Sequence, residues 1–112
     1  MAKTMWTREE AIIFIRELSL KMQLAGYEIA LAGGVLKKGK SSKDLDLIIF
    51  PTTTERANLV AARNSLRSAG LVCLMPKEEV QARWLVDHGS RDKKHVEVWR
   101  YKGKRVDLFF LT

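Results

Sequence analysis

Apolar residues recur every three or four positions in residues 8–24, and this spacing predicts an amphipathic helix. The preceding letters TREE match a capping box, in which the Thr7 side chain caps the first turn and Glu10 reaches back. Gly26 follows the last apolar position and favours the end of the helix. The first predicted element is therefore a helix over residues 8–24.

Residues 44–50 alternate and then become continuously apolar, which predicts an interior strand buried on both faces. Thr54 is the expected N-cap of the next helix, with Val60 on its inner side, and Lys102-Gly103 is the expected turn of a hairpin. The order of elements predicts an α+β fold of two layers, with a mixed sheet of about five strands flanked by helices. Helices are expected over 8–24, 35–40, 55–69 and 77–87, strands over 27–32, 44–50, 71–75, 95–101 and 104–111, and a loop over 89–94.

The composition is that of a folded globular chain. With 112 residues, of which 46% are hydrophobic and 29% charged, residues 1–112 are expected to form a single domain. There is no apolar run long enough to span a bilayer and no signal-peptide pattern, so we expect an intracellular, cytoplasmic protein without a membrane partner. The single cysteine, Cys73, excludes a disulfide framework and is expected to be a small buried hydrophobe.

The net positive charge of the chain favours negatively charged partners. Twenty Lys and Arg against thirteen Asp and Glu leave a formal net charge of +7, which favours nucleic acid or a nucleoside triphosphate. A surface that is charged only for solubility would have the same net charge. The residues of the candidate site are therefore needed to decide between a polyanion-binding surface and a solubility surface.

Carboxylates supply the candidate chemistry. Asp44 and Asp46 are two positions apart on a predicted strand and therefore project from the same face. Asp107 lies between apolar residues on the terminal strand, and three carboxylates converge if the two strands are adjacent. An all-oxygen ligand set suits Mg²⁺ or Mn²⁺ rather than zinc, and a two-metal site of this kind serves phosphoryl transfer. If the two strands are not adjacent, Asp44 and Asp46 would simply be charged residues in solvent at the start of a strand.

A glycine turn precedes the acids. Gly33 and Gly34 allow the backbone to approach a ligand closely, and amides at the start of the following short helix suit phosphate oxygens. Lys37, Lys38 and Lys40 add charge beside the turn, although an exposed loop that contains these lysines and Lys43 would have the same composition. The predicted nucleotide-phosphate contacts are Gly33, Gly34, Lys37 and Lys38.

The spacing and order of the glycines and acids resemble those of a known protein family. The pattern is an apolar strand with Gly-Gly, then Asp-apolar-Asp eleven residues after Gly33, then a distant Arg-Val-Asp-Leu. It resembles the nucleotidyltransferase superfamily typified by DNA polymerase beta, and is most similar to the palm of family X polymerases over roughly residues 27–111. The chain has Gly34 where many members have serine, and Lys37 where family X members often have arginine.

The resemblance implies roles for the candidate residues. Asp44, Asp46 and Asp107 would bind two divalent metals, Asp107 would also accept the proton of the attacking hydroxyl, and Arg105 would hold this acid and the primer-end hydroxyl. The implied reaction transfers a nucleoside monophosphate from an NTP or dNTP to a hydroxyl, such as that of DNA or RNA, and releases pyrophosphate. Polymerases continue past the third acid into a thumb, so a small or single-stranded acceptor, a protein side chain or a separate subunit is expected here.

Two other functions stay open at this point. One is an antitoxin-like or regulatory subunit that acts on or binds a partner protein. The other is a basic nucleic-acid-binding module without catalysis that uses the +7 charge. Trp84, Trp99 and Tyr101 are of the type that stacks on bases, but the favoured interpretation is that they cover the sheet or a subunit contact.

Overall fold

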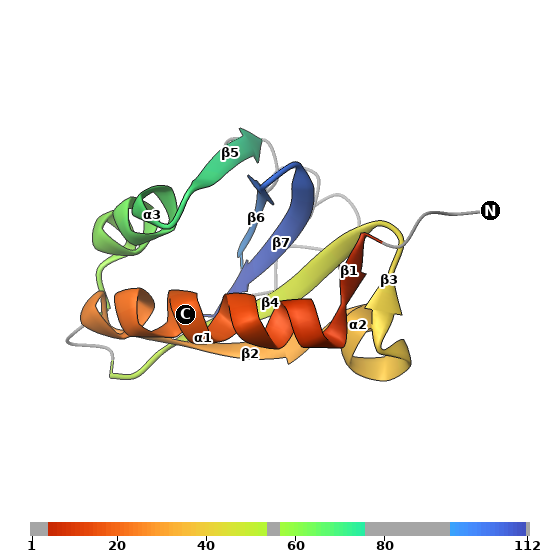
Figure 1. The fold of residues 1–112 in the computed structure, drawn as a ribbon. Helices are drawn as coiled ribbons and strands as arrows, with labels where there is room; N and C mark the ends of the chain where they lie inside the picture. The colour runs from red at the N-terminus through yellow and green to blue at the C-terminus, as the bar shows by residue number, and fades with distance from the viewer. Residues whose placement is uncertain (1–4, 54–56, 76–94, 112) are drawn as a thin grey trace.

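A computed structural model describes residues 5–53, 57–75 and 95–111, which form a five-stranded mixed sheet and helices packed on it (Figure 1). The elements are β1 (Trp6–Thr7), α1 (Arg8–Leu24), β2 (Tyr27–Ala32), α2 (Gly33–Lys38), β3 (Lys40–Ser41), β4 (Asp44–Pro51), α3 (Leu59–Ser68), β5 (Leu71–Met75), β6 (His95–Tyr101) and β7 (Lys104–Phe110). The predicted fold class, α+β with a mixed sheet of five strands, is confirmed.

The sheet has the strand order β2-β4-β7-β6-β5. Only β4 and β7 run parallel among these pairs, and the other neighbours are antiparallel. β1 and β3 form a separate two-stranded ribbon beside α2, at the end of the sheet where β4 begins (Figure 1). The topology thus places the start of β4 directly beside the start of β7, although more than half of the chain separates them in sequence.

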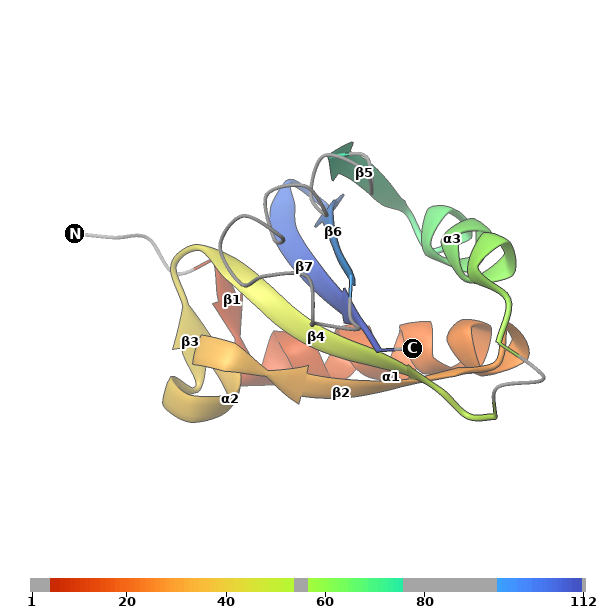
Figure 2. The ribbon, with the colours of Figure 1, turned by 180° about the vertical axis from the view of Figure 1, so that it is seen from behind.

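One face of the sheet is closed by α1 and α3. In Figure 1 α1 lies in front of the sheet, and in the reverse view of Figure 2 it lies behind it. A single cluster of buried side chains joins the helices to alternate positions of the strands, because successive strand residues point to opposite faces. Its members include Phe14, Leu18 and Met22 of α1, Ala62 and Leu66 of α3, and Leu45, Leu47, Ile49, Val106, Leu108 and Phe110 of β4 and β7.

The opposite face of β4 is more open than expected. Leu45, Leu47 and Ile49 are fully buried, whereas Ile48 is half-buried and Phe50 is 37% exposed. The prediction of burial on both faces was therefore wrong for this strand, because α1 and α3 pack on the same side of it. The carboxylates of β4 project from this more open face.

Local capping explains two helix boundaries. The capping box of α1 is present as predicted, with Thr7 accepting from the Glu10 amide and Glu10 accepting from the Thr7 amide. The start of α3 was predicted wrongly: Asn58 is its N-cap, accepting from the Ala61 amide at 3.0 Å, and the helix begins at Leu59. Thr54 lies outside the described residues.

Of the remaining structural predictions, one is confirmed, two are wrong and two lie outside the described residues. The hairpin is confirmed, with Lys102 and Gly103 at positive φ between β6 and β7. Val60 is 66% exposed rather than inward, and Cys73 is exposed rather than buried because it lies on the edge strand β5. The expected helix over 77–87 and loop over 89–94 lie outside the described residues. Within the described part of the chain, no helix has both the length and the apolar character needed to cross a membrane.

Candidate metal and nucleotide site

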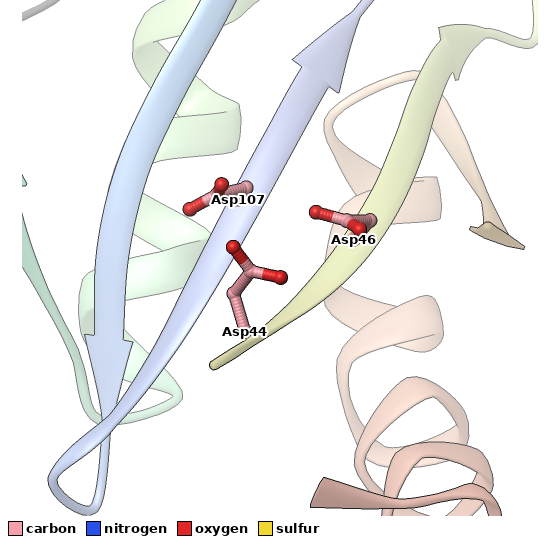
Figure 3. A group of neighbouring side chains, drawn as sticks. All are labelled: Asp44, Asp46 and Asp107. Atoms are coloured by element: carbon pink, nitrogen blue, oxygen red, sulfur yellow. The ribbon is translucent and has the colours of Figure 1, made fainter. Parts of the chain in front are cut away.

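Three carboxylates meet on the face of the sheet opposite α1 and α3 (Figure 3). In the parallel pairing of β4 with β7, Asp46 lies opposite Asp107 and Asp44 lies opposite Arg105. Because alternate strand residues share a face, Asp44, Asp46 and Asp107 all project to the same side. One carboxylate oxygen from each lies within 4.8 Å of the others. The predicted convergence of the three acids is confirmed.

Arg105 orients the most buried of these acids. Its Nε donates to Asp107 Oδ1 at 2.8 Å and its Nη2 donates to Oδ2 at 3.2 Å, which is a bidentate grip. Asp107 is only 8% exposed, whereas about half of the Arg105 side chain is open to solvent. The carboxylate of Asp107 is therefore held in one orientation, with an arginine beside it that a ligand can reach.

Burial and neighbouring negative charge disfavour ionisation of Asp44 and Asp46. Burial, followed by the negative charges of Asp44 and Asp107, raises the pKa of Asp46 to about 6. Burial, followed by the charge and hydrogen bonding of Asp107, likewise raises the pKa of Asp44 above its usual range. Arg105 offsets part of this effect for both groups. The hydrogen bonds of Arg105 go to Asp107, and the charge of Lys43 also offsets part of the effect on Asp44.

A hard divalent cation fits this arrangement. The donor set is oxygen only, as Mg²⁺ and Mn²⁺ prefer. Burial is the largest cause of the two raised pKa values, and a cation would compensate the neighbouring negative charge that adds to it. Asp44, Asp46 and Asp107 are therefore suited to hold such an ion.

The two glycines of the turn have different surroundings. Gly33 has φ +66°, and a Cβ built on it would lie 2.0 Å from Asp46 Oδ2. Gly34 has no positive φ, and the nearest described atom to a Cβ there is the Lys40 carbonyl oxygen at 4.0 Å. Gly33 is thus required by both its backbone conformation and the close approach of Asp46, whereas position 34 has room for a side chain.

A cationic pocket adjoins Asp44. It has a volume of about 380 Å³, and its lining contains Gly34, Lys38, Lys40, Ser41, Ser42, Lys43 and Asp44. Ser41 Oγ accepts from the amides of Lys43 and Asp44 at 3.2 and 3.3 Å, which shapes the turn into β4. Of the two predicted lysines, the lining includes Lys38 and not Lys37. Lys43 was not assigned to the site, although its position immediately before Asp44 was a usable signal.

A second, largely apolar pocket lies on the Asp46 side of the cluster. Its volume is about 260 Å³, and its lining is formed by Ala32, Gly33, Asp46, Ile48, Phe109 and Leu111. The carboxylates therefore separate a lysine-lined pocket from an apolar one.

The described aromatic candidates serve packing. Trp99 is fully buried, and its Nε1 donates to Glu97 Oε1 at 3.0 Å. Tyr101 packs on Phe14 with ring centroids 4.5 Å apart and on Trp6 at 6.5 Å. These contacts favour the reading in which the rings cover the sheet. Trp84 lies outside the described residues.

Comparison with known proteins identifies the fold. No protein-family model matches the chain, and no curated protein sequence matches it. Solved structures do match, among them a cytoplasmic RNA terminal U-transferase with 15% sequence identity and a TM-score of 0.57. The match covers 92% of this chain and 28% of that chain, so this chain spans little more than a quarter of that structure. The likeness shows that the α+β fold of this chain is also found in a nucleotidyltransferase.

Proposed function

We propose that the protein is a metal-dependent nucleotidyltransferase of the polymerase beta-like superfamily, which transfers a nucleoside monophosphate from an NTP or dNTP to a hydroxyl. The observation that carries the proposal is the meeting of three carboxylates from β4 and β7 beside a glycine turn and a lysine-lined pocket. The fold shared with a terminal U-transferase supports it. Asp44, Asp46 and Asp107 are the proposed ligands of Mg²⁺ or Mn²⁺.

The proposed reaction requires a binding site for the triphosphate, which the lysines and the glycine turn supply. The lysine-lined pocket binds the triphosphate, with Lys38, Lys40 and Lys43 opposing its negative charge. The Gly33-Gly34 turn allows the phosphates to approach the backbone closely. Lys37, which does not line the pocket, contributes charge from the end of α2.

Asp107 is the proposed general base. It accepts the proton of the acceptor hydroxyl, whose oxygen bonds to the α-phosphorus while the bond to the bridging oxygen breaks and pyrophosphate leaves. Arg105 holds Asp107 through two hydrogen bonds, so the accepting carboxylate stays in position. Bound divalent ions supply electrostatic stabilisation of the attacking and leaving oxygens.

A nucleotide-transfer assay tests the proposal. The protein is incubated with Mg²⁺ or Mn²⁺, each of the labelled NTPs and dNTPs, and a panel of single-stranded RNA, DNA and protein acceptors. RNA is the first acceptor to test, since the solved transferase of this fold acts on RNA according to its description. Label transfer that requires metal and disappears in Asp107→Asn is the expected result. Salt-dependent nucleic-acid binding with no metal requirement would instead support the non-catalytic alternative.

One observation favours a protein partner as a second candidate function. The outer side of α1 exposes apolar side chains, with Ile13 59%, Leu20 71% and Leu24 91% exposed. A regulatory subunit would bury such residues against its partner. Leu20→Glu combined with Leu24→Glu tests this, because it should abolish co-purification of a partner and leave nucleotide transfer unchanged.

A further inference from the structure

Residues 5–8, near the amino terminus, contact three elements around the candidate site: α2, β3 and β7. Met5 and Arg8 donate backbone hydrogen bonds to the carbonyls of Ser41 and Gly39 at 2.9 and 2.8 Å. The Arg8 guanidinium donates to the Leu36 carbonyl at 2.9 Å, at the end of α2. We call residues 5–8 the amino-terminal clasp. It holds α2 and β3, which lie beside β1 in Figure 2. Both elements contribute residues to the lining of the lysine-lined pocket.

Trp6 connects the clasp to the strand that carries the third acid. Its Nε1 donates to the Arg105 carbonyl at 3.0 Å, across the whole length of the sequence. The ring is 2% exposed and packs on Phe14, and the Lys104 ammonium lies 4.9 Å from its centroid. Trp6 therefore cannot turn away from Arg105 without losing this packing.

Both neighbours of Trp6 contact a residue of the carboxylate cluster, Ser41 at the backbone of Asp44 and Arg105 at the carboxylate of Asp107. Trp6 pairs with Ser41 in the β1–β3 ribbon, and Ser41 Oγ accepts from the Asp44 amide. On the other side, the residue whose carbonyl Trp6 binds is the one whose guanidinium grips Asp107. The beginnings of β4 and β7 are thus linked through Trp6, by its backbone on the Ser41 side and its indole on the Arg105 side, as well as through their own pairing.

We propose that Trp6 is a positioning residue of the carboxylate site, which sets the placement of Asp107 relative to Asp44 through its hydrogen bond to the Arg105 carbonyl. The inference rests on the proposed function, in that the two carboxylates must share a divalent ion. Trp6 is in the lining of neither the lysine-lined pocket nor the apolar pocket beside Asp46. Its effect passes through Arg105 on one side and Ser41 on the other.

The test removes the indole N–H and keeps the ring. Benzothienylalanine incorporated at position 6 has the bicyclic shape of tryptophan and no N–H donor. The matched control is the same replacement at position 99, where the indole N–H donates to Glu97 on the helix-covered face. Mn²⁺ affinity, transfer kinetics and amide hydrogen exchange are measured on the full chain for both.

Opposite outcomes are expected at the two positions. Replacement at position 6 should weaken Mn²⁺ binding about tenfold, since groups that orient metal ligands have effects of this order. It should also lower kcat more than it raises KM for the triphosphate, and speed hydrogen exchange at the amides of Asp44 and Asp107. Replacement at position 99 should lower the melting temperature and leave Mn²⁺ affinity within about twofold of the parent.

Three results separate failure of this inference from failure of the proposed function. Unchanged Mn²⁺ affinity at position 6, or an equal loss at position 99, overturns the role of Trp6. A parent protein that binds Mn²⁺ but transfers no nucleotide refutes the proposed function, and the affinities still decide the role of Trp6. If the parent binds no Mn²⁺, exchange at Asp44 and Asp107 decides: faster exchange only with the position-6 replacement supports the role, and no difference overturns it.

Discussion

The two faces of the sheet each carry buried acid, and the acids differ in how they are compensated. Glu97 lies on the helix-covered face and is 1% exposed. Arg63 of α3 donates to it, with Nη2 at 2.9 Å from Oε2, and the Trp99 indole donates to its other oxygen. On the opposite face, Arg105 hydrogen-bonds to Asp107, and its charge offsets only part of the rise in the pKa of Asp44 and Asp46.

This difference separates a charge-compensated structural acid from the proposed metal-binding cluster. Around Glu97 the charge of a single carboxylate is matched by an arginine and an indole N–H, as buried charges require. Around Asp46 the negative charges exceed the positive ones, and the pKa of Asp46 rises to about 6 as a result of burial and this excess. The excess is what a bound cation would remove, so we expect the two groups to respond oppositely to mutation and to metal.

The largest expected effect is loss of Asp107, the proposed base and metal ligand. Asp107→Asn should lower the transfer rate by more than about 1000-fold, because general-base and metal-ligand roles are lost together. Glu97→Gln, on the other face, should leave the rate per folded molecule unchanged. Single-turnover assays on both variants measure this, and equal losses would contradict the distinction between the two faces.

The glycine turn gives the next largest effect. Gly33→Ala should lower the transfer rate about 100-fold, since displacement of a catalytic group by about 1 Å has this consequence and the new Cβ would meet Asp46 Oδ2 at 2.0 Å. Gly34→Ala is the matched control and should lose far less, because position 34 is open. Steady-state kinetics on the pair measures the difference, and similar losses in both would refute the argument from the Asp46 contact.

Stability should respond mainly on the helix-covered face. Glu97→Gln removes the charge that Arg63 compensates, and we expect the free energy of unfolding to fall by about 2–3 kcal/mol. Asp46→Asn should not destabilise the metal-free protein at pH 7, because it removes a carboxylate whose ionised form is disfavoured. Urea unfolding with EDTA present compares the two variants. Destabilisation of Asp46→Asn as large as that of Glu97→Gln would contradict the prediction.

The smallest effect concerns pH. The pKa of Asp46 is raised to about 6 in the folded protein, above its value of about 4 when unfolded. Between these values the folded state binds more protons than the unfolded state, so the contribution of Asp46 to stability falls as pH rises from about 4 to about 6. A divalent ion binds the deprotonated carboxylates, so Mg²⁺ should raise the melting temperature by a few degrees at pH 7.5 and less at pH 5.

Thermal melts at both pH values, with Mg²⁺ or EDTA, measure this effect. Asp46→Asn serves as the control and should lose most of the Mg²⁺ response. A response to Mg²⁺ that is equal at both pH values would show that the ion binds elsewhere.

Local signals in the sequence were enough for most of the elements. The capping box and the spacing of apolar residues predicted α1 with its observed bounds, because both depend on contacts within one or two turns of helix. The same holds for the placement of Asp44 and Asp46 on one face of β4, since side chains alternate along a strand. The start of α3 was missed because Thr54 and Asn58 are both good N-caps, and the choice between them is not made by local preference alone.

The sequence by itself determined the pair of acids, the glycine turn and the hairpin that carries Asp107, because each is specified by neighbouring residues. Only the tertiary structure decided that β4 and β7 pair in the register that brings Asp107 opposite Asp46. It also decided that Gly33 rather than Gly34 contacts Asp46, that Lys43 rather than Lys37 lines the cationic pocket, and that Glu97 has its charge compensated by Arg63. These contacts join segments far apart in the chain, and their geometry follows from how helices and strands pack together rather than from any local pattern.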